Sequence, residues 1–265
     1  MNMYLKELRN YRKATIFWSL AIVFFMLASM SKYEGYSKAG VSVNEIFEGL
    51  PAGLSSFMGA NIIDLQTAGG WFAICVLYLS VMLGVHAVLL GSGVIGKEEN
   101  DKTIEFLFAK PVSRNRILFF KLMAAFTVIA ILNIVTLAVS VVTVAAFNAG
   151  TSINGDIVFL MPSIFFIQLF FLTVGVSFAA VMPRPRRAGM YSAAILLITF
   201  IISAFVDIAD KYEFLKYITP FQYFDPKKIF AEHAYNVTYI LITVATVTIA
   251  LVFSSFVYKN RDFSV

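Results

Sequence analysis

Six long apolar segments, each without a charged residue near its middle, limit what this chain can fold into. The hydrocarbon core of a bilayer is about 30 Å thick, and a helix of roughly 20 residues crosses it. Inside that core the backbone must satisfy its own hydrogen bonds, so apolar runs of this length form helices. The predicted spans cover residues 14–30, 70–95, 117–147, 157–182, 188–206 and 237–258.

The composition supports the same conclusion. Of the 265 residues, 59% are hydrophobic and 14% are charged, whereas about a quarter of the residues in a soluble domain are charged. We therefore expect an all-α integral membrane protein, with residues 1–265 forming a single transmembrane domain. The single cysteine, Cys75, cannot form an internal disulfide and is expected to act as a small buried hydrophobic residue.

Residues 1–13 precede the first span and predict an amphipathic helix in the membrane interface. Tyr4, Leu5 and Leu8 recur at helical spacing, opposite Lys6 and other basic side chains. A disordered basic tail is the alternative. The apolar run that follows is interpreted as a retained span, because it is longer than a signal-peptide core and lacks a small-residue cleavage site.

The distribution of lysine and arginine predicts the orientation, because cytoplasmic loops carry an excess of these residues. With six spans, both termini lie on one side, together with the 97–116 loop and the 183–187 loop. That side carries fifteen of the 21 basic residues. We therefore expect both termini and these two loops to be cytoplasmic, and the protein to be a multi-pass protein of the plasma membrane, in a bacterium.

The most highly charged stretch of the chain, residues 97–121, lies between the second and third predicted spans. Ile104, Leu107 and Phe108 fall at positions i, i+3 and i+4, so they share one face of a short helix. Pro111 is expected to end that helix, since the residue before a proline is driven out of the helical region. An apolar face in this place must contact either lipid headgroups or a partner protein.

The next helix is expected to begin just after Pro111. Ser113 is suited to cap it, because a serine side chain can accept a hydrogen bond from the first turn of a helix. The predicted helix then continues into the third span. Lys121, Arg114 and Arg116 are expected to anchor the loop at lipid headgroups.

This loop resembles that of the permease subunits of type-2 ATP-binding-cassette (ABC) exporters, whose pattern is approximately E-E-x-x-G-T-x-E-x-L-L-x-x-P-x-S-R-x-x-I-x-x-x-K. Residues in register with the pattern are Glu98, Glu99, Thr103, Glu105, Leu107, Pro111, Ser113, Arg114, Ile117 and Lys121. The chain departs from the pattern at Lys102, where glycine is usual, and at Phe108, where leucine is usual. The layout of six spans and the outer segment at residues 217–226 extend the resemblance to nearly the whole chain.

The resemblance implies that residues 97–116 carry a cytoplasmic coupling helix that docks on a separate ATPase subunit. The implied coupling residues are Glu98, Glu99, Thr103, Ile104, Glu105, Leu107, Phe108, Pro111 and Arg114. It also implies a dimer with a second permease copy or paralogue, and ATP and magnesium bound by the partner ATPase instead of by this chain. No nucleic acid is expected as a partner.

A possible nucleotide-binding motif, residues 91–98, does not fit a P-loop. It matches G-x-x-x-x-G-K but ends in Glu98, where a P-loop needs serine or threonine for magnesium. Its glycines are expected to let helices approach closely or to loosen the helix end. His86, in the middle of the second span, is expected to be a packed neutral histidine bonded to a neighbouring helix, with a place on a substrate path as the alternative. We expect neither catalytic nor metal-ligating residues in the chain.

No acidic or basic side chain lies deep in any predicted span, although transporters driven by protons or sodium need such groups to bind the coupling ion. The sequence therefore favours a permease of an ATP-driven exporter, which is not itself an enzyme. The alternatives are a membrane protein for immunity to, or sensing of, a peptide antibiotic without transport, and a membrane-embedded enzyme. The enzyme would require clustered polar residues at the interface, and the sequence has no such cluster.

Overall fold

The computed structural model describes residues 3–40, 42–59, 62–100, 112–148, 150, 152–183, 187–208 and 210–261. The helices in chain order are α1 (Met3–Ala39), α2 (Val43–Glu48), α3 (Ala52–Met58), α4 (Ala68–Asn100), α6 (Arg114–Phe147), α7 (Asn154–Val181), α8 (Ala188–Ile208), the 3-10 helix η2 (Asp210–Tyr217), α9 (Pro220–Tyr223), α10 (Pro226–Glu232) and α11 (Val237–Asn260). These ranges contain no β-strand.

Six of these helices (α1, α4, α6, α7, α8 and α11) are long and apolar enough to cross a membrane. The predicted fold class, an all-α integral membrane protein with six spans, is confirmed. The bounds of the helices differ from the predicted spans mainly at the ends, where helical structure continues beyond the apolar run. Pro162 is accommodated inside α7, nine positions into the helix.

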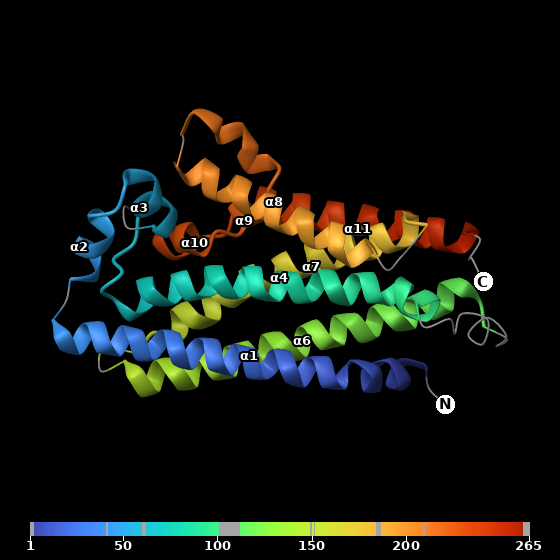
Figure 1. Cartoon of the computed structure of the whole chain (residues 1–265), viewed down its shortest axis with the longest axis horizontal. Coiled ribbons are helices and arrows are strands. Elements are labelled where there is room, and N and C mark those ends of the chain that lie inside the picture. The colour runs from blue at the N-terminus through green and yellow to red at the C-terminus, as the bar shows by residue number, and fades with distance from the viewer. Residues whose placement is uncertain are drawn as a thin grey trace.

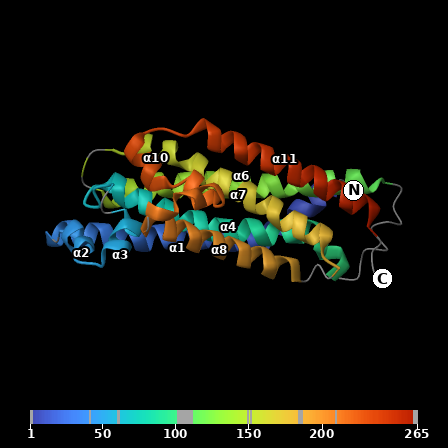
Figure 2. The same ribbon diagram turned by 90° about the horizontal axis from the view of Figure 1, so that it is seen from above.

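The six long helices form an elongated bundle in which successive spans run in opposite directions (Figure 1). Both chain termini lie at one end, which we call the terminal end. The short helices α2, α3 and α10 lie at the opposite end, which we call the distal end. The view from above shows the same arrangement, with α4 and α7 crossing the middle of the bundle (Figure 2).

Helix α4 is the core of the bundle. Of the residues in its most apolar stretch 72% are buried, compared with 11% in α11 and 17% in α1. Large apolar side chains on the outer helices, such as Phe17 and Phe24 of α1 and Phe256 of α11, are instead more than half exposed. This distribution suits a protein whose outer surface contacts lipid tails, because lipid does not force apolar side chains inward.

Two glycines allow α4 and α7 to pack backbone against backbone. A Cβ atom added at Gly91 of α4 would overlap the carbonyl oxygen of Leu172, and one at Gly175 of α7 would overlap that of Val88. Small residues at such a crossing allow close approach, and the dispersion contacts then hold the helices together. The prediction that a glycine of the 91–98 stretch serves helix packing is confirmed at Gly91, while Gly93 faces open space.

Helix α1 includes the predicted interfacial segment but is not divided there. From Met3 it continues through the first span to Ala39, because neither proline nor glycine interrupts residues 3–34. Its first turns pack on α6, where the hydroxyl groups of Tyr4 and Thr127 are 2.9 Å apart. The inward face includes Glu7, whereas Leu5, predicted for the apolar face, is 58% exposed.

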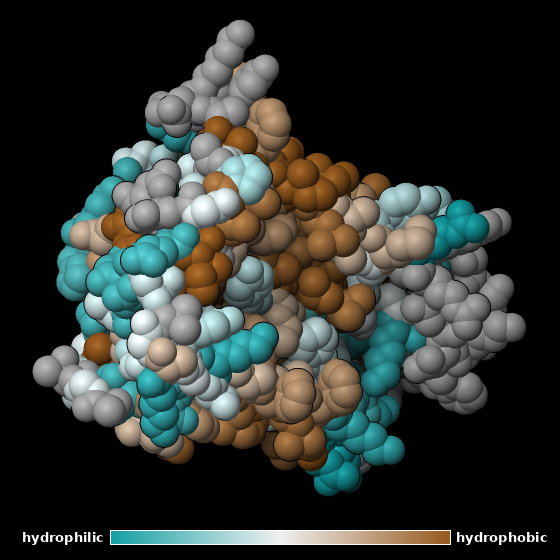
Figure 3. Space-filling model, turned by 60° about the vertical axis from the view of Figure 1, so that its left-hand side comes forward, coloured by the Kyte–Doolittle hydropathy of each residue, from teal (hydrophilic) through white to brown (hydrophobic). Residues whose placement is uncertain are grey.

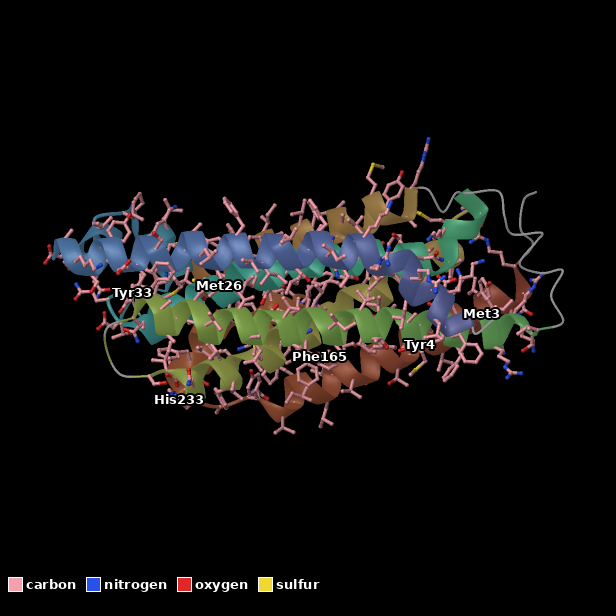
Figure 4. The ribbon with its side chains drawn as sticks, turned by 90° about the horizontal axis from the view of Figure 1, so that it is seen from below. Met3, Tyr4, Met26, Tyr33, Phe165 and His233 are labelled. Atoms are coloured by element: carbon pink, nitrogen blue, oxygen red, sulfur yellow. The ribbon has the colours of Figure 1, made fainter. Side chains whose placement is uncertain are left out.

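The same pairing of α1 with α6 continues along both helices. Figure 4 shows α1 lying beside α6. Met26 and Tyr33, which are labelled on α1, are both buried. Beyond the predicted end of the first span at residue 30, α1 continues as a helix into water, where Glu34 and Lys38 form an ion pair at 2.6 Å. Such pairs at i and i+4 support exposed helices.

Hydrophilic side chains gather at the distal end, and hydrophobic side chains cover the flank behind it (Figure 3). The segment between the first two spans contains α2 and α3. Gly59 ends α3 in the left-handed conformation (φ 78°), which glycine adopts at little steric cost. This surface pattern is expected for a bundle whose distal end contacts water and whose flank contacts lipid.

We predict that Gly91→Ala and Gly175→Ala each destabilise the bundle by about 1–3 kcal/mol, the typical cost of overpacking. Gly93→Ala is the matched control in the same helix and is expected to be neutral or slightly stabilising, since glycine costs a helix about 0.5–1 kcal/mol relative to alanine. The measurement is unfolding by denaturing detergent in mixed micelles. Equal losses for all three variants would contradict the packing role.

Candidate coupling site at the terminal end

The predicted coupling loop joins the end of α4 to the start of α6. Residues 101–111 lie outside the described residues, but the structure describes the two helix ends that carry them. Ser113 occupies the N-cap position of α6, as predicted, although its side chain makes no capping hydrogen bond. The Ser113 carbonyl accepts from the Ile117 amide at 3.1 Å, which is the first backbone hydrogen bond of the helix.

Arg261, just after α11, joins three helices at this end. Its guanidinium donates to both carboxylate oxygens of Glu99 on α4, at 3.2 and 3.1 Å. It also donates to the carbonyls of Ala179 and Ala180 at the end of α7, at 2.6 and 3.3 Å. The side chains of Arg261 and Glu99 are only 11% and 7% exposed. A planar guanidinium suits this role, since it can bind a carboxylate through two parallel hydrogen bonds.

Arg114 makes the corresponding connection from the first residue of α6. Its guanidinium donates to the carbonyls of Lys259 and Arg261, at 3.1 and 2.8 Å. Carbonyls at the end of a helix have no partner within the helix, and a cation there also interacts favourably with the helix dipole. Arg114 therefore fixes the start of α6 to the end of α11.

Lys121 contributes a third connection, and its location corrects the prediction of a headgroup anchor. Its side chain is 1% exposed, and its ammonium donates to the Val94 carbonyl of α4 at 2.8 Å. Val94 lies three residues before Lys97, the first charged residue of the loop. A carbonyl near a glycine-rich helix end offers the lysine an acceptor inside the bundle, so the side chain turns inward instead of toward lipid.

We call Glu99, Arg114, Lys121 and Arg261 the basal cluster. It brings together two of the nine predicted coupling residues, Glu99 and Arg114. The side chain of Glu98 and all of Thr103, Ile104, Glu105, Leu107, Phe108 and Pro111 lie outside the described residues. Sequence reasoning missed Arg261, because a basic residue in a C-terminal tail carries no signal of a carboxylate 162 positions away.

A second buried ionic cluster lies at the distal end. The Lys227 ammonium is 2.9 Å from Asp207 at the end of α8 and 3.6 Å from Asp225, and it donates to the Phe57 carbonyl of α3 at 2.7 Å. Burial acts to lower the pKa of Lys227, but Asp225 and Asp207 together raise it above its usual value. Lys227 therefore remains charged and ties the distal helices to the spans.

The sequence signal for this cluster is local. Asp225 precedes Pro226 at the start of α10, and its side chain accepts from the Lys227 amide as an N-cap. That pattern predicts a helix start. It does not predict that the side chain of Lys227 turns inward, which depends on Asp207 arriving from α8.

Most serine and threonine side chains of the spans donate to a carbonyl of their own helix, as Thr136 does to Leu132, and a few polar side chains bond between helices. The amide of Asn133 on α6 donates to the Gln168 side chain of α7 at 2.5 Å. His86 is buried and packs edge-on against Trp18 of α1. The predicted packing of this histidine is therefore confirmed, and its Nδ1 atom has no hydrogen-bond partner among the described residues.

Chemically, the two clusters consist of ion pairs and charge-assisted hydrogen bonds. Within the described residues, no three His, Cys, Asp or Glu side chains are grouped to hold a metal ion. The one carboxylate of the basal cluster, that of Glu99, faces the Arg261 guanidinium, so the arrangement can hold helix ends together. These contacts connect the described ends of α4 and α6, which flank residues 101–111, with α7 and α11.

The bundle has the architecture of a multi-pass membrane protein in which a charged loop joins two of the packed spans. The family model described as ABC-2 family transporter protein matches residues 1–263. The chain therefore belongs to the ABC-2 transporter family and is a membrane subunit of a transporter. No curated protein matches the sequence.

We predict that Arg261→Ala destabilises the protein by about 3 kcal/mol, because it leaves Glu99 buried without its partner. Lys259→Ala is the control, since its side chain is exposed and its carbonyl still accepts from Arg114. In the double variant Glu99→Ala with Arg261→Ala, the loss should be smaller than the sum of the single losses. The free energy of unfolding in mixed micelles is measured for the three single variants, Glu99→Ala included, and for the double variant. Additive losses would show that the ion pair contributes nothing to stability.

Proposed function

We propose that this chain is the permease subunit of an ATP-driven exporter, and that a separate ATP-binding-cassette ATPase drives it through residues 97–116. The family establishes a transporter membrane subunit. The basal cluster supports the proposed coupling between the loop and the spans. It connects the two helices that flank the loop with α7 and α11, so a force applied to the loop reaches four of the six spans.

No acidic or basic side chain lies near the middle of the described spans, which supports this energy source. The buried charged side chains of the described span helices lie toward their ends: Glu7 is in the first turns of α1, Asp207 is at the end of α8, and Lys121 lies near the loop and is bonded to a backbone carbonyl. A group of that kind is positioned for a structural role. Energy then has to enter from outside the spans, and ATP binding to a docked partner provides it.

The mechanism requires that the docked loop differ in its interactions between two states of the ATPase, since a ligand shifts an equilibrium only by its differential affinity. In our proposal Ile104, Leu107 and Phe108 provide the apolar contact with the ATPase, and ATP and magnesium bind to that partner. Glu99 and Arg114, which are engaged within the chain, position the loop. The basal cluster then transmits the movement to α4 and α6.

A complete translocation path requires a second permease, either a copy or a paralogue. Supporting this, α8 and α11 present rows of exposed apolar side chains, among them Ile201, Phe205, Leu241 and Ile249. Part of this surface contacts lipid, and part is available to a partner permease. The terminal end faces the cytoplasm in this assembly, which sits in the plasma membrane of a bacterium.

We predict that Leu107→Asp abolishes association with the ATPase, because a carboxylate on the apolar face has to be desolvated on docking. The full-length tagged protein is purified from the membranes of its own host, and co-purifying ATPase subunits are identified by mass spectrometry. Recovery of the ATPase should fall at least tenfold.

Ala109→Asp is the matched control, since it adds the same side chain away from the predicted apolar face. It should retain the ATPase. Both variants should unfold in mixed micelles as the unmodified protein does. Undiminished recovery with Leu107→Asp would refute docking through this face, and loss with both variants would attribute the effect to charge alone.

The orientation is tested with engineered cysteines in a Cys75→Ala background, which removes the only native thiol. Gly35→Cys places a thiol in open space at the distal end, and Arg187→Cys places one at an exposed position of the terminal end. A membrane-impermeant maleimide applied to intact cells should label the first and reach the second only after lysis. The reverse pattern would invert the proposed topology.

A further inference from the structure

A cavity of about 420 Å³ lies between α1 and α4 in the distal half of the bundle. Phe25, Ser29 and Lys32 line it from one face of α1, and Trp71 and Cys75 line it from the facing side of α4. Residues of α2 and α3 cover its distal side. The basal cluster lies at the other end of the bundle, so this cavity is separate from the coupling site.

The walls of the cavity are apolar because their polar atoms are already bonded to one another. The Trp71 indole N–H donates to the Ser29 hydroxyl at 3.1 Å, and that hydroxyl lies 2.9 Å from the Cys75 sulfur. The Tyr78 hydroxyl donates to the Met58 sulfur at 3.6 Å. What remains toward the interior is aromatic and aliphatic surface, which suits a hydrocarbon ligand.

The mouth of the cavity is polar and carries a positive charge. Lys32 is exposed there and forms no ion pair with any described residue, unlike Lys38, which pairs with Glu34. A second, more polar cavity of about 220 Å³ adjoins the first and shares Tyr36 in its lining. An apolar chamber that leads to a cation and a polar chamber fits an amphiphile with a negatively charged head.

The apolar part of the cavity lies within the distal leaflet of a bilayer. Lys13 and Lys32 bound 18 residues of α1 without a charge, a helix length of about 27 Å, so Lys32 marks the distal edge of the hydrocarbon core. From Phe25 to Lys32 the helix rises about 10 Å, which is two-thirds of the roughly 15 Å of half a hydrocarbon core. The part of the cavity lined by Phe25, Ala28 and Ser29 therefore lies at the depth of the distal leaflet, and the part lined by Tyr36 lies beyond it.

We infer that this cavity binds one acyl chain of an anionic phospholipid from the distal leaflet, with the phosphate of the headgroup held by Lys32. The inference depends on the protein being embedded in a membrane, which the family establishes, and not on the proposed coupling to an ATPase. It assigns a lipid-binding role to the segment from α1 through α3, which the transport mechanism leaves without one.

The test uses tryptophan fluorescence, because the chain has two tryptophans and Trp71 lines the cavity. A full-length Trp18→Phe protein in lipid nanodiscs retains Trp71 as its only reporter. Brominated acyl chains quench tryptophan on contact. At equal mole fractions, brominated phosphatidylglycerol should quench Trp71 roughly fivefold more strongly than brominated phosphatidylcholine, the factor expected for one lysine beside an anionic lipid.

Lys32→Gln should remove this preference, and Lys38→Gln, the matched control outside the cavity, should retain it. Ala28→Phe, which fills the cavity, should reduce quenching by both lipids, whereas Ala28→Ser should not. Equal quenching by the two lipids in the protein that retains Lys32 would overturn the assignment of the headgroup to this residue. No quenching by either lipid, in a protein of normal stability, would show that the cavity is closed to bilayer chains and overturn the inference entirely.

Discussion

The close contact between α4 and α7 is the interaction on which the rest of the structure depends. Lipid tails are as apolar as the side chains of the spans, so burial of apolar area alone does little to bring membrane helices together. Backbone approach at Gly91 and Gly175 provides dispersion contacts that lipid cannot replace. With α4 fixed in this way, the outer helices pack on a central pair and leave apolar faces for lipid or for a partner.

Ionic clusters at the two ends complement that packing. At the terminal end, Arg261 joins Glu99 to the end of α7, and at the distal end, Lys227 joins α10 to α8 and α3. Both lie outside the mid-membrane region, where unpaired charge is expensive. A bundle held by packing in the middle and by ion pairs at its ends is suited to transmit movement between its two sides.

The structure also separates two kinds of lipid contact. The exposed apolar faces of α8 and α11 are convex helix surfaces that any lipid chain can cover. The cavity between α1 and α4 is a concave site with a charged mouth, and concave sites select their ligands more strongly than open surfaces do. The distal half of the protein therefore combines structural helices with a candidate lipid site.

The sequence by itself determined the membrane class, the approximate place of six spans, the position of Ser113 at the start of α6, and the packing role of a glycine in the 91–98 stretch. These are local properties, since the length of an apolar run, a capping residue and a small side chain act within a few residues of chain. The α1 helix was harder to delimit, because helical structure continues past the apolar run wherever no residue interrupts it. Only the tertiary structure decided that Lys121 and Lys227 turn inward and that Arg261 reaches Glu99. Such contacts depend on which helix ends lie side by side in the folded bundle. The sequence around each residue does not indicate which distant residue it will contact.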